Sequence, residues 1–374
     1  MTILPTCPER LTMIPREIAA VKDYEQFAKE RLNANAWSYL TGGAADEITL
    51  HENEKVFERI RLKSKVLRSV AGGNTHVTLL GHTYAHPILL APVAYQRLFH
   101  PEGERASALG ASIMEAGMVV STLASIKWDD IVASTAYPSW FQLYFQRNRI
   151  ETLNIVRRAE AAGFKVMVIT VDAPLAGIRN REHRAHFQLP CDISAVNLRN
   201  ISSSEVPVTP VISPGANKSI VFDHLMAASP TWKDIEWLVT VTTLPVIVKG
   251  ILDCDDGLVA EKCGAAGIIV SNHGGRVIDT LPSTLEALPL IAKALDKRIP
   301  ILLDGGIRRG SDIFKAIALG ASAVLIGRPY IYALATAGAL GVAHTLRILR
   351  EELEVIMAVT GHATLQNIDQ SSLF

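Results

Sequence analysis

Eight short apolar runs, separated by helical patterns, constrain the fold of this chain more than any other feature of its sequence. Each run has five to seven residues and ends in turn-forming residues; they are 88–93, 117–122, 139–145, 166–172, 245–249, 266–271, 300–304 and 322–326. Near-continuous Val and Ile runs suit strands that are buried on both faces, and alternation with helices implies parallel strands joined by crossovers. The sequence therefore predicts an α/β fold in which eight such units close into a (β/α)8 TIM barrel.

Helical patterns lie between most of these runs. Helices are predicted over 103–116, 150–163, 254–264, 283–296 and 310–319, and one N-terminal helix over 18–40, ended by Gly42-Gly43. We expect a single domain over 1–374, with an N-terminal helical segment (1–85) followed by the barrel (86–374). A doubly wound sheet is the alternative, but neither a G-x-G-x-x-G after a strand nor a P-loop motif supports it.

One stretch interrupts the alternation. Residues 188–231 are rich in Ser, Pro and Asn and form too long a segment for an ordinary loop between strand and helix. In a barrel this long loop after the fourth strand lies on the catalytic rim, so it is either an active-site lid or a surface loop without fixed structure. The sequence leaves both interpretations open.

Composition limits the partners and the compartment. Lys plus Arg (37) equals Asp plus Glu (37), so no overall field favours nucleic acid or an anionic membrane. The four cysteines show no C-x-x-C spacing, which indicates reduced thiols. The start of the chain has no signal-peptide pattern, and no apolar run reaches the ~18–20 residues that span a bilayer. We expect a cytoplasmic protein with neither nucleic-acid nor membrane partners.

Polar residues recur where the predicted strands end. Barrel enzymes place their working residues at the carboxyl ends of the strands, and this chain has there Gln142, Tyr144, Thr170, Asp172, Lys249, Ser271, His273, Arg276, Asp304 and Arg328. Each one alone is equally well explained as a polar residue at a strand end. Their joint occurrence on one rim predicts an active site.

The turns after the last two strands suggest a phosphate site. Residues 304–310 (DGGIRRG) offer glycine N–H groups and two arginines before a helix, and Gly327-Arg328 offers a similar set. Barrel phosphate sites commonly lie there, at a helix N-terminus. Glycines that merely form tight turns are the alternative, and the residues themselves do not say whether a phosphate belongs to substrate or cofactor.

His273 and Arg276 are separated by two glycines, which keep the backbone close to a ligand. A histidine can take a proton from a hydroxyl near neutral pH, and an arginine can bind a carboxylate through two parallel hydrogen bonds. Asp172 is placed to hold the imidazole. The pair His183 and His186 has no third ligand at a suitable spacing, so we expect surface histidines and no metal.

With these residues collected, the chain resembles the FMN-dependent 2-hydroxy acid oxidase and dehydrogenase family from about Tyr24 to Ile368. The matching motifs, in order, are YLTGGA (39–44), APVA (91–94), HPEGE (100–104), FQLY (141–144), TVDAP (170–174), KG (249–250), SNHGGR (271–276), DGGIRRG (304–310) and IGRP (326–329). Together they are highly specific.

The resemblance implies that the phosphate is that of FMN. It places Asp304, Gly305, Gly306, Arg308, Gly327 and Arg328 near the ribityl phosphate. It lines the isoalloxazine and ribityl chain with Pro92, Val93, Ala94, Ser121, Gln142, Thr170, Lys249 and Ser271. A cation such as Lys249 beside the flavin would stabilise the anionic reduced form.

The resemblance also implies the substrate contacts. Arg179 and Arg276 would clamp the substrate carboxylate, helped by Tyr39, while Tyr144 would bind the 2-hydroxyl. His273, oriented by Asp172, would take the hydroxyl proton as two electrons pass to the flavin. The product would be a 2-oxo acid, and the choice between hydride and carbanion transfer stays open. The family handles the (S) enantiomer and commonly forms tetramers.

Leu123 departs from the tryptophan that glycolate oxidases have at this position. The smaller side chain leaves room at C2 of the substrate, so we expect L-lactate or a somewhat longer acid. The 188–231 loop lacks a sustained hydrophobic or basic run, which favours an oxidase that reduces O2 to hydrogen peroxide over a membrane-bound dehydrogenase.

Several alternatives stay open within and outside this class. Within it they are a soluble dehydrogenase, a lactate monooxygenase and a glycolate oxidase. An FMN-dependent isomerase of isoprenoid diphosphates would need acidic metal ligands, which the sequence does not cluster. A non-catalytic barrel is disfavoured by the complete set of rim residues.

Overall fold

The strands form one closed parallel barrel. The computed structural model describes residues 9–199, 219, 221–222, 226 and 229–374. The strands follow one another around the barrel in the order β10-β3-β4-β5-β6-β7-β8-β9. They are β3 (Ile88–Leu90), β4 (Met118–Ser121), β5 (Ser139–Leu143), β6 (Val166–Thr170), β7 (Val246–Ile251), β8 (Gly267–Val270), β9 (Ile301–Leu303) and β10 (Ala323–Ile326). All eight predicted runs are strands, and the predicted TIM barrel is confirmed.

Burial on both faces explains why these runs are strands. Every residue of β4, β5, β6 and β8 is buried, as expected when side chains alternate between the barrel interior and the surrounding helices. The parallel register brings polar residues to the same edge. Ser121 of β4 pairs with Gln142 of β5, and Thr170 of β6 pairs with Lys249 of β7. The carboxyl ends therefore form a polar rim on an apolar core.

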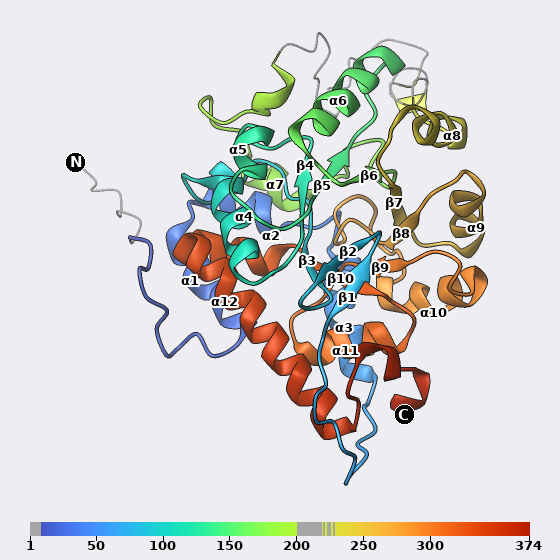
Figure 1. The fold of residues 1–374 in the computed structure, drawn as a ribbon. Helices are drawn as coiled ribbons and strands as arrows, with labels where there is room; N and C mark the ends of the chain where they lie inside the picture. Colours follow the sequence, from blue (N-terminus) through green and yellow to red (C-terminus); the bar gives the residue numbers. More distant parts are fainter. Residues whose placement is uncertain (1–8, 200–218, 220, 223–225, 227–228) are drawn as a thin grey trace.

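Helices surround the barrel (Figure 1). They are α4 (Gly103–Ile113), α5 (Trp128–Val132), α6 (Arg149–Ala162), α8 (Trp232–Val241), α9 (Cys254–Lys262), α10 (Thr284–Leu295) and α11 (Gly310–Ala318). The five helices predicted between strands are confirmed as α4, α6, α9, α10 and α11. Their ends carry expected signals: Asn148 caps α6, and Ser283 forms a capping box with Glu286 at the start of α10.

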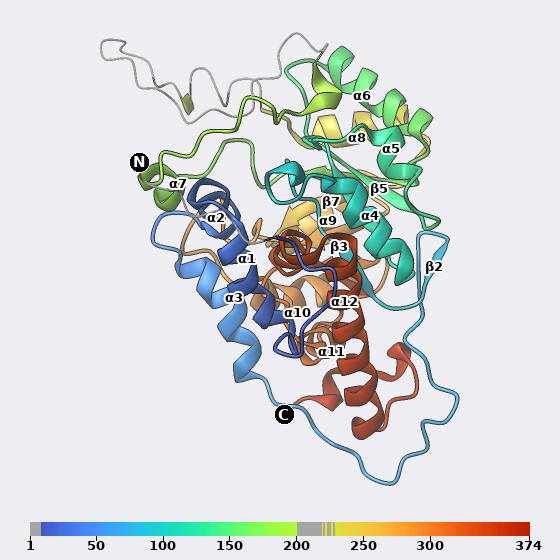
Figure 2. The ribbon, with the colours of Figure 1, turned by 90° about the vertical axis from the view of Figure 1, so that its left-hand side faces the viewer.

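The long helix α12 (Arg328–Thr360) closes the fold against α4 and α11 (Figures 1 and 2). It is kinked at Ala337 and Gly338, whose backbone is not helical. A Cβ on Gly338 would lie 2.9 Å from His100 Nε2, so the kink needs glycine. By length and hydropathy α12 could cross a membrane, but 78% of the apolar window is buried inside the fold. That burial is typical of a core helix.

The N-terminal segment differs from the prediction. The single helix expected over 18–40 is wrong: α1 (Tyr24–Arg31) ends before Leu32, and α2 (Ala34–Thr41) begins after Asn33. The Asn33 side chain accepts a hydrogen bond from Ala36 N, so it starts a new helix where the apolar spacing continues without a break. The sequence reasoning also missed α3 (Ile48–Arg59) and the hairpin of β1 (Val77–Leu79) and β2 (His82–Tyr84).

The N-terminal segment is fixed to the rim of the barrel by polar contacts. The Asp279 carboxylate accepts hydrogen bonds from three backbone N–H groups at the start of α3. The amides of Asn53 and Asn272 exchange two hydrogen bonds of 2.9 and 2.8 Å. Gly275 O accepts from Ala44 N at 2.7 Å. Residues 39–54 are thereby held beside the loop that carries His273 and Arg276.

The loop predicted over 188–231 lies largely outside the described residues, so its role as a lid stays a prediction. Its described ends line the cavity on the rim, through Gln188, Leu189, Ser194, Ala195, Leu198 and Pro230 among others. Of the four cysteines, Cys191, Cys254 and Cys263 lie in the described part of the chain, and all three are free thiols.

Candidate active site

A cavity of about 1480 Å³ lies at the carboxyl ends of the strands. Of the residues predicted to form the site, 19 line it: Tyr39, Pro92, Val93, Ala94, Ser121, Leu123, Gln142, Tyr144, Thr170, Arg179, Lys249, His273, Arg276, Asp304, Gly305, Gly306, Arg308, Gly327 and Arg328. The remaining two, Asp172 and Ser271, lie behind this lining. Asp172 is hydrogen-bonded to His273, and Ser271 accepts a hydrogen bond from Lys249. The residues predicted for the site therefore lie together around one cavity.

His273 and Asp172 form a hydrogen-bonded pair. Nδ1 of His273 lies 2.8 Å from Oδ1 of Asp172. Burial would raise the pKa of Asp172, but His273 and Lys249 outweigh it and hold that pKa below its ordinary value. The carboxylate is therefore ionised and accepts the Nδ1 proton, an assignment made from the hydrogen-bond network. Nε2 is the ring nitrogen that this hydrogen bond leaves available.

Gly250 is what allows Asp172 to stand at this point. Its φ is +113°, and a Cβ there would lie 2.5 Å from Cβ of Asp172. Any other residue would both strain the backbone and collide with the carboxylate. Lys249 and Gly250 therefore have different roles: Lys249 supplies a cation, and Gly250 leaves space for Asp172.

Lys249 is a buried cation with two partners. Its Nζ donates to Ser271 Oγ at 2.7 Å and lies 3.0 Å from Asp304 Oδ2. Burial would lower the pKa of Lys249, but Asp304 and Asp172 raise it above its ordinary value. The ammonium group therefore stays charged at neutral pH in the middle of the rim.

Arg179 and Arg276 meet at a residue that the sequence reasoning missed. Arg276 Nη2 donates to Oε1 of Glu182 at 2.9 Å, and Arg179 Nη1 lies 3.1 Å from both oxygens of that carboxylate. Arg276 Nη1 also donates to the backbone carbonyls of Tyr39 and Gly42. Burial and the charge of Arg179 lower the pKa of Arg276, and Glu182 opposes that shift.

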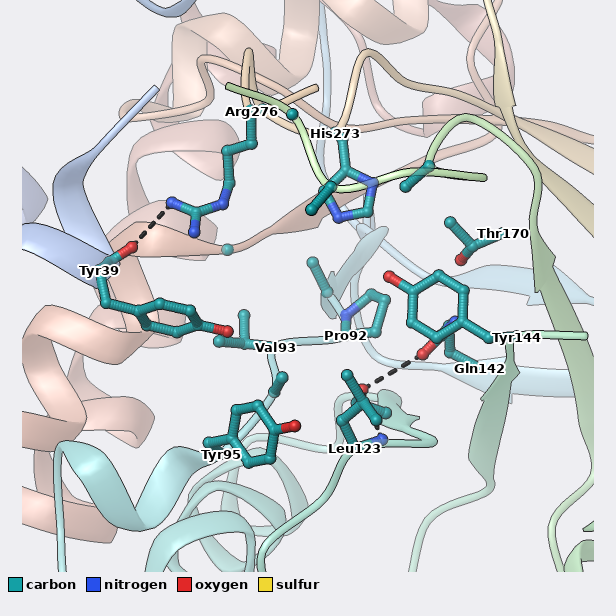
Figure 3. Close-up of a pocket in the computed structure, with 18 of the residues that line it drawn as sticks. Tyr39, Pro92, Val93, Tyr95, Leu123, Gln142, Tyr144, Thr170, His273 and Arg276 are labelled. Carbon is teal, nitrogen blue, oxygen red and sulfur yellow. Dashed lines mark hydrogen bonds between the residues drawn. The ribbon is translucent and has the colours of Figure 1, made fainter. Parts of the chain in front are cut away.

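Two tyrosines point into the same space. Figure 3 shows the Tyr39 and Tyr144 hydroxyls, His273 and Arg276 around a shared opening. Burial raises the pKa of both tyrosines above the ordinary value, so both hydroxyls are neutral hydrogen-bond donors. The Tyr39 ring stacks on Phe187 with centroids 4.7 Å apart, and the Arg276 guanidinium lies 5.2 Å from its centroid.

The opposite wall is apolar and comes from the loops after β3 and β4. Tyr95 and Leu123 lie across the opening from His273 (Figure 3), and Tyr95 N donates to Leu123 O at 3.1 Å. The buried carboxylate of Glu104 ties the two loops together, because it accepts from Gln96 N at 3.1 Å and Ser125 N at 2.8 Å. Glu104 thus fixes the wall without lining the cavity.

The far end of the cavity holds the predicted phosphate cradle. Gly305 and Gly306 have φ of +95° and +81°, and a Cβ on Gly306 would lie 1.8 Å from Asn53 O. Arg308 Nη2 donates to Glu54 Oε1 at 2.7 Å. Arg328 donates to the backbone carbonyls of Leu40, Gly42 and Gly274. Both arginines therefore line this end while contacting the N-terminal segment.

A family model described as FMN-dependent dehydrogenase matches residues 28–374. The chain belongs to this family. It is 45% identical to an L-lactate oxidase of Nostoc sp., with 94% of this chain and 96% of the relative covered. It is 39% identical to a glycolate oxidase of Spinacia oleracea, with 96% of each covered. A crystal structure of a mandelate oxidase with (S)-2-phenylpropionate superposes with a TM-score of 0.84 at 38% identity, covering 95% and 97% of the two chains.

As a member of this family the protein is an FMN-dependent enzyme that oxidises a 2-hydroxy acid of (S) configuration, with O2 as acceptor. Its own residues fit FMN. Gln142 Oε1 accepts from Ser121 Oγ and Thr122 N, while its buried Nε2 has no partner among the described residues. Such an orphan donor beside a buried lysine suits a polar heterocycle. The glycine turn at 305–306 and the two arginines suit a phosphate.

His183 and His186 lie exposed at the mouth of the cavity, as expected of surface histidines. Among the described residues, a group with metal-like spacing is Asp253, Cys254 and Asp255 at the start of α9. The Asp253 side chain accepts hydrogen bonds from the N–H groups of Asp255 and Asp256, as an N-cap residue of a helix does.

Proposed function

We propose that this enzyme oxidises L-lactate or a somewhat longer (S)-2-hydroxy acid to the 2-oxo acid and reduces O2 to hydrogen peroxide. The observation that carries the reaction is the His273–Asp172 pair, which faces the same opening as the paired arginines Arg179 and Arg276. A base and a carboxylate clamp across one opening are what a 2-hydroxy acid requires.

Each polar residue has a role in this proposal. Arg179 and Arg276 bind the substrate carboxylate, helped by the Tyr39 hydroxyl, and the neutral Tyr144 hydroxyl binds the 2-hydroxyl. His273 Nε2 takes the hydroxyl proton. Asp172 then stabilises the imidazolium through its 2.8 Å hydrogen bond.

FMN, when bound, supplies the acceptor for the two electrons that leave C2 of the substrate. We propose that its ring and ribityl chain are contacted by Pro92, Val93, Ala94, Ser121, Gln142, Thr170, Lys249 and Ser271. We propose that its phosphate is held by Asp304, Gly305, Gly306, Arg308, Gly327 and Arg328. Lys249 is placed to keep a positive charge beside the ring, because Asp304 and Asp172 raise its pKa.

Leu123 supports the choice of substrate. It lies with Tyr95 on the apolar wall across the opening from His273, and we propose that the substituent on C2 points to this wall. An aliphatic side chain leaves room for a methyl or a longer chain, and the relatives named above act on acids from glycolate to mandelate. An apolar pocket discriminates one methylene by only ~1–3 kcal/mol, so we expect a graded preference along the series.

The test is steady-state oxidation of a chain-length series of (S)-2-hydroxy acids, with O2 uptake and peroxide yield measured together. We expect anaerobic L-lactate to bleach the yellow flavin and air to restore it, with one peroxide per 2-oxo acid. Absence of bleaching throughout the series would refute the proposal. Bleaching without O2 uptake would identify a dehydrogenase, and decarboxylated product without peroxide would identify a monooxygenase. A cytoplasmic location and a homotetramer are part of the proposal.

A further inference from the structure

Glu182 is a cavity-lining carboxylate that the proposed mechanism does not use. It lies on the short helix α7 (Asn180–Arg184), and its side chain is 13% exposed. Its partners are the two arginines proposed to bind the substrate carboxylate. A carboxylate placed against two carboxylate-binding groups has a direct effect on the ligand that those groups can take.

The two arginines depend on Glu182 to different degrees. Arg276 is anchored without it, because Nη1 donates to Tyr39 O at 2.8 Å and to Gly42 O at 2.7 Å. The Arg179 side chain has only one other hydrogen bond among the described residues, a 3.4 Å contact from Nε to Arg276 O. Glu182 therefore determines where the Arg179 guanidinium lies, and the backbone of residues 39–42 determines where the Arg276 guanidinium lies.

Enough donors are left for a substrate. A guanidinium has five N–H groups. Arg276 gives three of them to the Tyr39 carbonyl, the Gly42 carbonyl and Glu182, so two are free of protein acceptors within the described residues. Two N–H groups are what a bidentate carboxylate needs. The carboxylate of Glu182 can therefore stay in place while a substrate carboxylate binds.

The charge balance follows from this arrangement. Two guanidinium groups with one retained carboxylate leave a net charge of about +1, which a single substrate carboxylate neutralises. A second carboxylate on the ligand would meet the uncompensated repulsion of Glu182 in a partly buried site, where charges interact more strongly than in water.

We propose that Glu182 is a positioning and specificity residue: it orients Arg179 and sets the charge of the clamp so that the site selects acids with one carboxylate over acids with two. This inference rests on the proposed function, since it concerns the same clamp. It adds to that proposal a third residue, Glu182, and a preference for acids with one carboxylate.

The test compares the holoenzyme with Glu182→Gln, which keeps the shape and one acceptor but removes the charge. The readout is the ratio of kcat/KM for (S)-malate to that for L-lactate, because malate adds a second carboxylate to the lactate skeleton. We expect the ratio to rise about fivefold or more in Glu182→Gln and to return towards the wild-type value in Glu182→Asp. Because each ratio compares two acids in the same variant, general damage to the enzyme cancels.

Glu47→Gln is the matched control. Glu47 pairs with Arg181, which lies on α7 as Glu182 does. Neither Glu47 nor Arg181 lines the cavity. The Glu47→Gln substitution removes one negative charge close to α7 but removes no partner of Arg179 or Arg276. We therefore expect an unchanged malate-to-lactate ratio of kcat/KM. A malate-to-lactate ratio within twofold of wild type in Glu182→Gln, or a rise of equal size in Glu47→Gln, would overturn the inference.

A binding measurement separates this inference from the proposed function. Titration of the flavin absorbance with oxalate and with acetate gives the affinities for a dianion and a monoanion without turnover. We expect Glu182→Gln to favour oxalate over acetate about fivefold more than the wild type does, and more strongly at low ionic strength. This result can hold even where no 2-hydroxy acid is oxidised, and an unchanged preference refutes the role of Glu182 even in an active oxidase.

Discussion

Asp172→Asn tests the base most directly. The substitution keeps the size of the side chain but removes the charge that lies 2.8 Å from His273 Nδ1. In the proposed reaction the ring gains a proton, so the wild-type enzyme would form a partly buried ion pair and the variant a partly buried imidazolium without a counterion. Removing one partner of a fully buried pair costs about 3–5 kcal/mol, which is the upper bound for this partly buried one. That bound corresponds to a loss of about 10²- to 10⁴-fold in kcat, since 1.36 kcal/mol is tenfold.

The assay is steady-state oxidation of L-lactate, with FMN content measured on the same samples. We expect KM to change little, because Arg179 and Arg276 donate no hydrogen bond to Asp172, and we expect FMN to be retained. A loss in kcat below about tenfold in an FMN-loaded variant would show that the reaction does not charge His273. A rise in KM as large as the loss in kcat would show instead that the substitution had disturbed substrate binding by Arg179 and Arg276.

The same substitution has a pH signature in stability. The folded protein holds the pKa of Asp172 below its ordinary value. The carboxylate therefore contributes stability that is present above the unfolded pKa of about 3.9 and is lost as the pH falls through the lower folded value. We expect the stability gap between wild type and Asp172→Asn to be constant near neutral pH and to shrink below about pH 4 in thermal melts.

Three further outcomes follow from the site. His273→Gln is expected to retain FMN and lose about 10³-fold or more in turnover, and unchanged turnover would remove His273 from the role of base. Leu123→Trp is expected to narrow the apolar wall, so that kcat/KM falls ~10–200-fold for long acids relative to glycolate in the chain-length series. Arg328→Met is expected to leave the Leu40 and Gly274 carbonyls without this donor, while Gly42 O keeps its bond from Arg276; at about 1 kcal/mol or more for each carbonyl, we expect a lower Tm and loss of FMN. A melting temperature equal to wild type would show that Arg328 does not fix the N-terminal segment.

The barrel could be predicted from the sequence because its signal is local. A strand buried on both faces needs an unbroken apolar run, and runs such as 166–172 and 300–304 stand out without knowledge of their neighbours. The N-terminal segment gave a weaker signal. Helical spacing continues through Leu32 and Asn33, and only the hydrogen bond from Ala36 N to the Asn33 side chain shows that a second helix begins there.

Part of the lining was predictable for the same reason, since a strand's carboxyl end can be read from its last apolar residue. Other lining residues, such as Tyr39 and Arg179, were predicted only from the family resemblance. The pairing of Asp172 with His273 was also predicted, but other partners of that lining were not. Glu182 pairs with Arg276, 94 residues away in the sequence, and Glu104 supports loops at both Gln96 and Ser125. A faint sign of Glu182 existed, because an acidic residue three positions after Arg179 can reach it along one helical turn. Nothing in the sequence indicated that it also reaches Arg276.

The contacts of Arg276 and Arg328 connect the site to the folding of the N-terminal segment. Both side chains come from the barrel, and both donate to backbone carbonyls between residues 39 and 42. Burial lowers the pKa of Arg328 to about 10, which still leaves it charged at neutral pH. A guanidinium removed from water needs acceptors, and each arginine would lose two of its acceptors if this segment undocked. The segment in turn contributes Tyr39 to the cavity, so the barrel and the segment complete the clamp together.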